Sequence, residues 1–213
     1  MSDDLAALRA EYGDTGLDEA DAATDPWIQW RRWFEDAVAA GLHEPNAMIV
    51  ATVDADGLPS ARTVLLKGVT ADGFRFFTNT ESRKGEALAA RPACALLFPW
   101  HPLERQVRVE GVAERLSQAD VEAYFASRPR GSQLGAWASR QSRVVAGRDE
   151  LAVAYREVEE RFEGRDVPVP TDWGGYVVRP RSFEFWQGRR GRLHDRLRYA
   201  EADSGWTIER LAP

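Results

Sequence analysis

Apolar and polar residues alternate along much of the chain, which predicts β-strands in most of it. Residues 47–53 show this two-residue period and are followed by the turn signal Asp56-Gly57. Further strands are expected at 60–69, 74–78, 93–100 and 105–115, with a second turn at Asp72-Gly73. Because turns this short join antiparallel neighbours, the pattern predicts an antiparallel sheet.

A period of three to four residues, typical of helices, is found in fewer places. Asp25-Pro26 fits the start of a helix and Gly41 fits its end. The apolar face expected between them is formed by Trp27, Trp30, Phe34 and Val38. Other helices are expected from Ser82 to 90, from Ser117 to 126, from Ser132 onward, and over 148–162. These helices are inserted between strands and do not alternate with them.

The C-terminal part returns to the two-residue period, at 175–179, at 182–187 continuing through 192–199, and at 206–211. In a strand over this region, Arg192, His194 and Arg196 lie on one face. An imidazole between two guanidiniums favours its neutral form and a role facing a ligand. The whole pattern predicts a mainly β fold with inserted helices (α+β), with the antiparallel sheet curled into a barrel. A doubly wound parallel sheet is disfavoured, because no Gly-x-Gly-x-x-Gly sequence follows a strand.

The charge of the chain is unevenly distributed. Residues 1–25 hold eight acidic side chains and one arginine, a balance of −7, whereas the 213-residue chain carries −6 in total. The remainder is therefore weakly positive. We predict an acidic, mobile arm at 1–25 and a single domain at 26–213, which is long enough for one sizeable core. The acidic total argues against nucleic acid as a partner, so small phosphorylated ligands fit the basic clusters better.

Several classes of protein are disfavoured by simple features of the sequence. No apolar run approaches the ~18–20 residues that span a bilayer, and the N-terminus is acidic and unlike a signal peptide. We therefore expect a cytoplasmic protein without a membrane partner. Cys94 lies in an apolar strand and is expected to be a buried thiol. His43, His101 and His194 are far apart, so no metal site is predicted and redox chemistry would need an organic cofactor.

Basic residues gather in several short segments that could hold anions. In a strand over 60–69, Arg62 and Lys67 lie on opposite faces and could each hold a separate anion. Arg83 and Lys84 stand at a predicted helix start, where free backbone amides favour an anion. The other candidates for binding a phosphate or a heterocycle are Gln106, Tyr124, Arg128 and Ser132. Each segment by itself also fits an ordinary solvated surface.

Taken together, five segments resemble the pyridoxamine 5′-phosphate oxidase family. They are RTVLLK (62–67), TNTESRKG (78–85), FPWHPLERQVRVEG (98–111), YFASRPRGSQLGAWASRQS (124–142) and EFWQGRRGRLHDR (184–196). The resemblance extends from about Asn46 to Pro213 and more weakly into the arm. It implies an FMN-binding split β-barrel that forms a homodimer with FMN at the interface. The implied reaction oxidises pyridoxamine or pyridoxine 5′-phosphate to pyridoxal 5′-phosphate and reduces O2 to H2O2.

The resemblance also implies roles for individual residues. The implied FMN contacts are Arg62, Thr63, Val64, Leu65, Leu66, Lys67, Phe77, Thr78, Arg83, Lys84, Gln106, Gln141, Ser142, Trp186 and Arg196. The implied substrate contacts are Lys67, Tyr124, Arg128, Ser132, Arg192 and His194, and more weakly Asp54, Arg9 and Tyr12. Arg192 and His194 would be the catalytic pair. Phe77 stands where the family commonly has tyrosine, so a lost hydroxyl contact would weaken FMN binding slightly.

Two other kinds of function fit the same fold. One is a different flavin- or deazaflavin-dependent split-barrel reductase, and the other is a flavin or pyridoxal-phosphate binding protein without turnover. The segments RPRGS (128–132) and RLHDR (192–196) favour the oxidase, because a carrier of flavin alone has no use for a second phosphate site. Nucleic-acid binding is a more distant alternative, which salt-sensitive retention on DNA would support.

Overall fold

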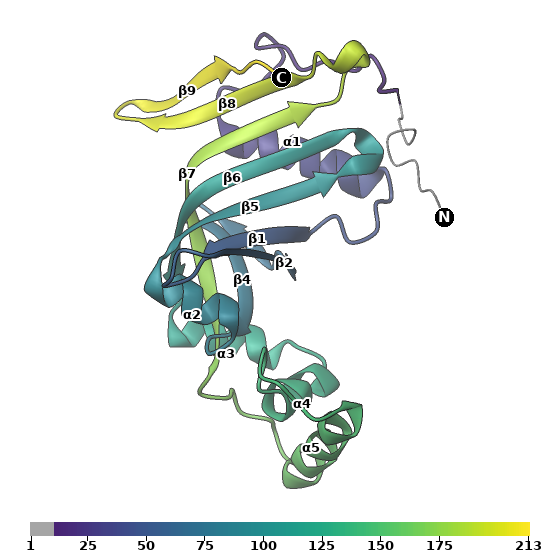
Figure 1. Cartoon of the computed structure of the whole chain (residues 1–213), viewed down its shortest axis with the longest axis vertical. Coiled ribbons are helices and arrows are strands. Elements are labelled where there is room, and N and C mark those ends of the chain that lie inside the picture. The colour runs from purple at the N-terminus through teal and green to yellow at the C-terminus, as the bar shows by residue number, and fades with distance from the viewer. Residues whose placement is uncertain (1–10) are drawn as a thin grey trace. The chain divides into compact units, whose positions relative to one another are not determined.

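The computed structural model describes residues 11–213, and Arg9 lies outside this range. The chain divides into two compact units. Unit 1 holds the described residues up to Ile49 together with Ala95–Glu110 and Pro180–Pro213, and unit 2 holds Val50–Cys94 and Gly111–Arg179. Four strands, which Figure 1 labels, have residues in both units: β1 (Ala47–Val53), β5 (Ala93–Trp100), β6 (Arg105–Arg115) and β7 (Trp173–Gln187). The prediction of a single domain with a mobile arm stays a prediction.

The strands belong to one antiparallel sheet. In residues 11–213 its order is β2-β1-β5-β6-β7-β4-β3, with β8 paired to β7 and to β9. The other strands are β2 (Pro59–Leu65), β3 (Gly68–Thr70), β4 (Gly73–Asn79), β8 (Asp195–Ala202) and β9 (Gly205–Arg210). The pairs β3·β4, β4·β7, β7·β8 and β8·β9 are all antiparallel. The predicted α+β class with an antiparallel sheet is therefore confirmed.

Five helices interrupt the strands in the described part of the chain. They are α1 (Pro26–Ala39), α2 (Arg83–Ala90), α3 (Gln118–Ala126), α4 (Arg130–Ala138) and α5 (Arg148–Arg161). Ser82 caps α2 and Ser117 caps α3, as predicted, because each hydroxyl accepts a backbone N–H of the first turn. None of these helices has the length and apolar character needed to cross a membrane. Cys94 is buried, as predicted, and burial raises the pKa of its thiol to about 12.

Helix α1 of unit 1 begins and ends as predicted, but its buried face differs. Asp25 accepts the backbone N–H of Trp27, and Gly41 follows the helix with a φ of 68°. The residues that face the core are Trp30, Trp33 and Ala37, whereas Val38 is 53% exposed. The predicted face was therefore partly wrong. Trp33 occupies the core side because its ring packs edge-on against Phe185, 5.3 Å away.

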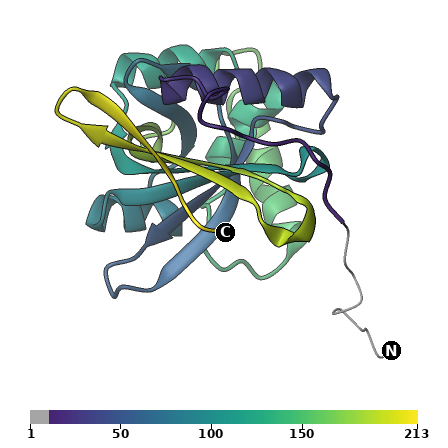
Figure 2. The same ribbon diagram turned by 90° about the horizontal axis from the view of Figure 1, so that it is seen from above.

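The C-terminal strands of unit 1 contain a break that the sequence pattern did not predict. Strand β7 ends at Gln187 and β8 begins at Asp195, with a short 3-10 turn at Arg190–Arg192 between them. Gly191 and Arg192 both have left-handed backbone conformations, with φ of 64° and 65°. The expected single strand through 192–199 is therefore wrong, and Arg192 and His194 do not alternate with Arg196. Strands β8 and β9 form a hairpin, which is yellow in Figure 2.

A second break separates Arg62 from Lys67 in unit 2. The predicted strand 60–69 is in fact two strands, β2 and β3, and Leu66 and Lys67 lie between them in neither strand. Leu66 is 7% exposed, and the backbone N–H of Lys67 donates to the carbonyl of Arg75 at 2.8 Å. Arg62 lies in β2 and Lys67 follows the end of that strand, so the two residues do not lie in one strand. The opposite-face argument for Arg62 and Lys67 does not hold.

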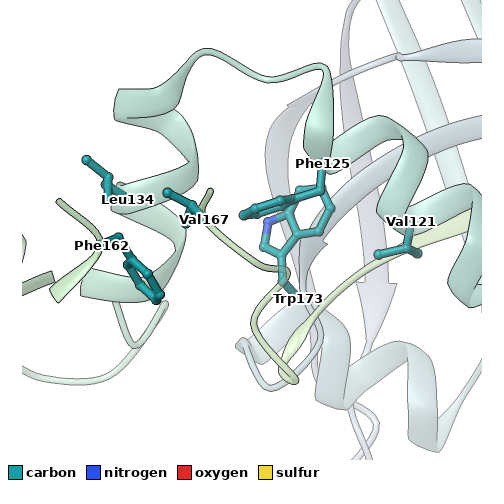
Figure 3. Close-up of a cluster of buried hydrophobic side chains, with 6 residues drawn as sticks. All are labelled: Val121, Phe125, Leu134, Phe162, Val167 and Trp173. Carbon is teal, nitrogen blue, oxygen red and sulfur yellow. The ribbon is translucent and has the colours of Figure 1, made fainter. Parts of the chain in front are cut away.

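Unit 2 has an apolar cluster beneath its helices. Its buried members are Val121, Phe125, Leu134, Phe162, Val167 and Trp173. Figure 3 shows Phe125 against the ring of Trp173, with the ring centroids 4.9 Å apart. Leu134 and Phe162 belong to the region where α4 and α5 lie side by side in Figure 1. The cluster thereby holds the connection between α3 and α4 in place.

Helix α4 begins two residues earlier than predicted. Pro129 precedes it, and the N–H of Ser132 donates to the carbonyl of Pro129 at 2.8 Å. Proline favours a helix start because its φ is already helical. Ser132 therefore lies in the first turn of the helix and does not begin it.

Candidate functional site

Unit 2 contains a cavity of about 810 Å³, within the usual range for small-molecule sites. Its walls come from β2, the end of β4, the start of α2, the α3–α4 region and the segment after α4. The predicted site residues that line it are Arg62, Thr63, Val64, Leu65, Lys67, Phe77, Thr78, Arg83, Lys84, Tyr124, Arg128, Ser132, Gln141 and Ser142. Residues from five separate segments of the sequence are thus brought to one cavity.

The cavity carries a strongly one-sided charge. Five cationic side chains line it: Arg62, Lys67, Arg83, Lys84 and Arg128. Among the described residues that line it there is no aspartate or glutamate. Unbalanced like charges around one space create a positive potential that favours an anion. The chemistry of these donors therefore fits a ligand with more than one negative charge.

Lys84 is a buried cation whose partners are all neutral. The residue is 8% exposed, and its Nζ donates to Thr78 Oγ1 at 2.9 Å, Ser82 Oγ at 3.2 Å and Gln141 Oε1 at 2.6 Å. Burial, and next the neighbouring charge of Arg62, lowers the pKa of Lys84 to about 8. A phosphate bound beside it would supply the missing counter-charge.

Arg62 is oriented by neutral oxygens in the same way. Its Nη1 donates to the carbonyl of Val50 at 3.0 Å and to Thr52 Oγ1 at 2.8 Å, and its Nη2 donates to Ser60 Oγ. Burial, followed by the charge of Arg83, lowers the pKa of Arg62. The hydrogen bonds to β1 fix the direction of the guanidinium without neutralising it.

Arg128 has a buried donor without a partner. Its guanidinium carbon lies 4.8 Å from the ring centre of Trp173 and 5.5 Å from that of Phe125. Nη1 of Arg128 is buried and makes no hydrogen bond to any described residue. An unsatisfied buried donor costs roughly 1–3 kcal/mol, so such groups generally have a functional explanation. A bound anion would satisfy it.

An aromatic stack forms the apolar side of the cavity. Phe77 stacks on Tyr124 with the ring centroids 3.9 Å apart, and it is nearly parallel to Trp173, 5.6 Å away. Trp173 was not among the predicted site residues. The signal for it was an aromatic residue directly before Gly174-Gly175, two small residues that allow close packing. Cationic and aromatic surfaces together fit a phosphorylated heterocycle such as a flavin nucleotide.

The substitution Gly175→Ala is expected to destabilise the protein by about 1–3 kcal/mol, because it overpacks this stack. A Cβ at Gly175 would lie 2.7 Å from both the Phe77 ring and Leu116. Gly135→Ala is the matched control: it also lines the cavity, but its Cβ would have nothing within 4 Å. Because Gly135 lies inside helix α4, Gly135→Ala should stabilise the protein by about 0.5–1 kcal/mol. Denaturant midpoints measure the stability of each variant. Equal stability of the two would contradict the packing argument.

Two predicted residues of unit 2 do not line the cavity. Asp54 accepts the backbone N–H groups of Asp56 at 3.1 Å and Leu58 at 2.8 Å, and so closes the turn between β1 and β2. Leu66 is buried and is not a lining residue. The proposed ligand roles of Asp54 and Leu66 therefore have no support from the cavity geometry.

In unit 1, three predicted cofactor contacts lie on the same face of the sheet as the buried carboxylate of Glu184. Trp186 pairs with Arg196 across β7 and β8. Glu184, two residues before Trp186 and 6% exposed, accepts from Arg196 Nε at 2.9 Å and from Arg108 Nη2 at 2.6 Å. Gln106 lies on this face too, because it is two residues from Arg108 on β6. Glu184 was not predicted, although its spacing from Trp186 was visible in the sequence.

His194 of unit 1 is half-buried and packs against two aromatic rings. The ring of Trp186 lies 4.6 Å from it and the ring of Tyr12 lies 5.1 Å from it, edge-on. Nδ1 of His194 accepts the backbone N–H of Arg189 at 3.1 Å, so the neutral imidazole carries its proton on Nε2. Burial, and then the charge of Arg192, lowers the pKa of His194. This direction agrees with the expected preference for the neutral form, although burial is its first cause and Arg192 is the only guanidinium that contributes.

No group of three or more histidine, cysteine, aspartate or glutamate side chains able to hold a metal ion is found in residues 11–213.

Comparisons with known proteins agree with the chemistry of the cavity. A family model described as pyridoxamine 5′-phosphate oxidase matches residues 34–162, and one described as the pyridoxine 5′-phosphate oxidase C-terminal dimerisation region matches residues 173–213. A pyridoxine/pyridoxamine 5′-phosphate oxidase of Nocardioides sp. is 64% identical over 210 residues, covering 99% of this chain and 98% of its own. The protein of the same name from Rubrobacter xylanophilus is 60% identical, with 99% and 97% covered.

Solved structures give the same fold. PhzG from Burkholderia lata, in complex with tetrahydrophenazine-1-carboxylic acid, has a TM-score of 0.88 and 27% identity, covering 96% of this chain and 100% of its own. An FMN-binding protein of Nostoc punctiforme, related to pyridoxamine 5′-phosphate oxidase, has a TM-score of 0.69 and 19% identity, with 86% and 97% covered. The predicted split β-barrel fold is confirmed. By its family models and its relatives, this chain is an oxidoreductase and belongs to the pyridoxine/pyridoxamine 5′-phosphate oxidase family.

Proposed function

We propose that the protein oxidises pyridoxamine 5′-phosphate and pyridoxine 5′-phosphate to pyridoxal 5′-phosphate, with FMN as its cofactor. Molecular oxygen is the electron acceptor and is reduced to hydrogen peroxide. The observation that carries this proposal is the unit 2 cavity with five cations and no acidic lining residue. Substrate and cofactor are both phosphate esters, so one reaction requires two phosphates to be bound at the same time.

The cations are proposed to divide between the two phosphates. Arg62, Arg83 and Lys84 would hold the phosphate of FMN, since Arg83 and Lys84 form the first turn of α2, where free backbone amides also favour an anion. Lys67 and Arg128 would hold the phosphate of the substrate. The unpartnered Nη1 of Arg128 supports the second assignment. Tyr124 and Ser132 line the same cavity and would add hydroxyl donors to the substrate phosphate.

Bound FMN would supply the redox chemistry by accepting a hydride from the exocyclic C4′ carbon of the substrate. The chain's own task is to bind both molecules rigidly and to exclude water. Arg192 and His194 are proposed to bind the pyridine end of the substrate. With Nδ1 engaged by Arg189, neutral His194 presents Nε2–H as a hydrogen-bond donor. Gln106, Trp186 and Arg196 are proposed FMN contacts, and the match to a dimerisation region supports a homodimer.

The alternatives differ from this proposal in their need for a second phosphate site. PhzG of Burkholderia lata binds tetrahydrophenazine-1-carboxylic acid, which contains a carboxylate and no phosphate. A carrier of flavin alone likewise needs only one phosphate site. Lys67 and Arg128, in addition to the cations assigned to FMN, favour a phosphorylated substrate.

The proposal is tested with purified protein and its absorption spectrum, followed by addition of pyridoxamine 5′-phosphate in air. The expected result is a flavin spectrum and the release of pyridoxal 5′-phosphate and hydrogen peroxide. Unphosphorylated pyridoxamine is the control substrate and should be used about 100-fold less efficiently, because it forgoes the charge-assisted contacts. A protein that takes up no FMN, or one that holds flavin and makes no peroxide, would overturn the proposal.

A further inference from the structure

Residues 12–23 are attached to unit 1 through backbone groups. The N–H of Gly13 donates to Glu104 Oε2 at 2.8 Å, and the N–H of Leu17 donates to Asp195 Oδ2 at 3.0 Å. Farther along, the carbonyl of Ala23 accepts from the hydroxyl of Tyr199 at 2.7 Å. Leu17 is 6% exposed. This segment, called the strap below, therefore has a defined course across unit 1.

Arg210 of β9 is the centre of the polar contacts that hold the strap. Its Nε donates to Glu19 Oε1 at 2.8 Å and its Nη2 to Glu19 Oε2 at 2.6 Å, a two-point contact with the carboxylate. Nη2 also donates to the carbonyl of Leu17 at 3.0 Å. Nη1 donates to Asp195 Oδ1 at 2.6 Å. Nη2 also lies 3.4 Å from Asp18 Oδ1, so one guanidinium joins three strap residues to strand β8.

Asp195 links this network to the candidate catalytic residues. It directly follows His194, and its side chain is 13% exposed. Its two oxygens accept from Arg210 Nη1, from the N–H of Leu17 and from Arg189 Nη1 at 3.3 Å. Arg189 in turn donates its backbone N–H to His194. The segment around His194 and the strap therefore share their polar partners.

The first residue of the strap, Tyr12, lies against the rings of His194 and Trp186. Tyr12 packs edge-on against His194 at 5.1 Å and against Trp186 at 5.8 Å. Two glycines permit this close approach: a Cβ at Gly188 would lie 2.5 Å from the Tyr12 ring, and a Cβ at Gly16 would collide with the guanidinium of Arg189. A side chain at Gly188 would displace the Tyr12 ring, whereas the guanidinium near Gly16 ends a flexible side chain that can move. The position of Tyr12 on His194 depends on where the strap is held.

We propose that Arg210, with Glu19 and Asp195, is a positioning residue that holds the strap so that Tyr12 stays packed on His194. The network acts on the substrate only through Tyr12 and His194, so its effect on catalysis rests on the proposed function above. Bidentate arginine–carboxylate pairs combine charge with fixed geometry, which suits them to hold a segment in one position. Releasing the strap would expose His194 to water.

The test compares Arg210→Gln and Glu19→Gln with Arg198→Gln. Arg198 is the matched control because it also donates Nε and Nη2 to a carboxylate, Glu209, in the same β8–β9 hairpin, without touching the strap. The first readout is the NMR titration of His194 in the full-length protein without substrate. The chain has three histidines, so His43 and His101 serve as internal references. This readout does not depend on the protein being an oxidase.

Arg210→Gln and Glu19→Gln are both expected to raise the pKa of His194 towards its ordinary value, and Arg198→Gln is expected to leave it unchanged. The KM for pyridoxamine 5′-phosphate should rise about tenfold in the two strap variants, with kcat within about twofold. Glu19→Gln keeps the Arg210–Asp195 pair, so it tests the idea even if Arg210→Gln folds poorly. An unchanged His194 titration in Glu19→Gln, or equal shifts in Arg198→Gln, would refute the positioning role. If the His194 titrations shift as expected but no peroxide is formed, only the proposed function is refuted.

Discussion

Replacing Arg128 with methionine is expected to raise the KM for pyridoxamine 5′-phosphate about 100-fold and to change kcat far less. Hydrogen bonds to charged groups contribute about 1.5–3 kcal/mol each, and about 1.4 kcal/mol corresponds to a factor of ten. Methionine keeps an apolar stem against Trp173, so the stack beneath Arg128 is preserved. The unpartnered Nη1 disappears in the variant, which removes the donor and its buried cost together. Steady-state peroxide formation measures the change.

Two controls separate a lost phosphate contact from general damage. With unphosphorylated pyridoxamine, Arg128→Met should behave like the parent protein, because that substrate never used the guanidinium. Arg130→Met is the neighbouring control: Arg130 donates to the carbonyls of Phe162 at 2.7 Å and Arg165 at 2.9 Å, so its loss should lower stability and leave phosphate selectivity intact. A variant at Arg128 with normal flavin content and a KM within about threefold of the parent would remove Arg128 from the phosphate site.

The strands that were predicted correctly are those whose pattern is local. Residues 47–53, 93–100 and 105–115 match β1, β5 and β6, since alternation of buried and exposed side chains is itself a property of a strand. The breaks at Lys67 and at Arg192 were missed. They depend on partners far along the chain. Lys67 is held by the carbonyl of Arg75 across β3 and β4, and the region before Arg192 is shaped by contacts with the strap.

The cations of the candidate site could be found from the sequence, because basic residues cluster visibly at strand ends and helix starts. Their partners could not. Trp173 lies beneath Arg128 only because β4 and β7 pair with Asn79 opposite Trp173, and Glu184 meets Arg108 only in the folded sheet. Such roles depend on register and packing, which a single sequence does not display. The roles of Arg9 and Asp54 came from resemblance alone, and they stay predictions.

The cations of the unit 2 cavity are held differently from Arg196 and Arg210 of unit 1. In unit 1, Arg196 and Arg210 are each paired with a carboxylate whose side chain is no more than 13% exposed, Glu184 or Asp195. Those charges are already balanced within the protein. In unit 2, Arg62, Lys84 and Arg128 are bound only by neutral oxygens or aromatic rings. A cation that is shielded from water without a counter-charge is unfavourable. These three cavity cations are therefore the ones whose free energy falls most when an anion binds.

Flavin affinity is therefore expected to fall as the pH rises above about 8, by up to tenfold per pH unit. In the flavin-free protein the pKa of Lys84 is about 8, so the ammonium that would hold the phosphate is lost above that value. The phosphate itself does not titrate there, because the second pKa of a phosphate monoester is about 6. Quenching of FMN fluorescence, measured from pH 7 to pH 10, gives the dissociation constant at each pH.

Lys84→Met should bind FMN about 100-fold more weakly at pH 7 and should lose the pH dependence above 8, because no proton remains to be gained. The stability of the flavin-free protein should instead rise with pH over this range, opposite to the change in FMN affinity. The ordinary lysine pKa of 10.5 lies above the folded value of about 8, so between these values the unfolded chain binds more protons and the folded state becomes more stable as pH rises. Denaturation of the flavin-free protein at pH 8 and pH 10 measures this gain in stability. If Lys84→Met kept the full pH dependence of FMN binding, a different group would be the one that titrates beside the phosphate.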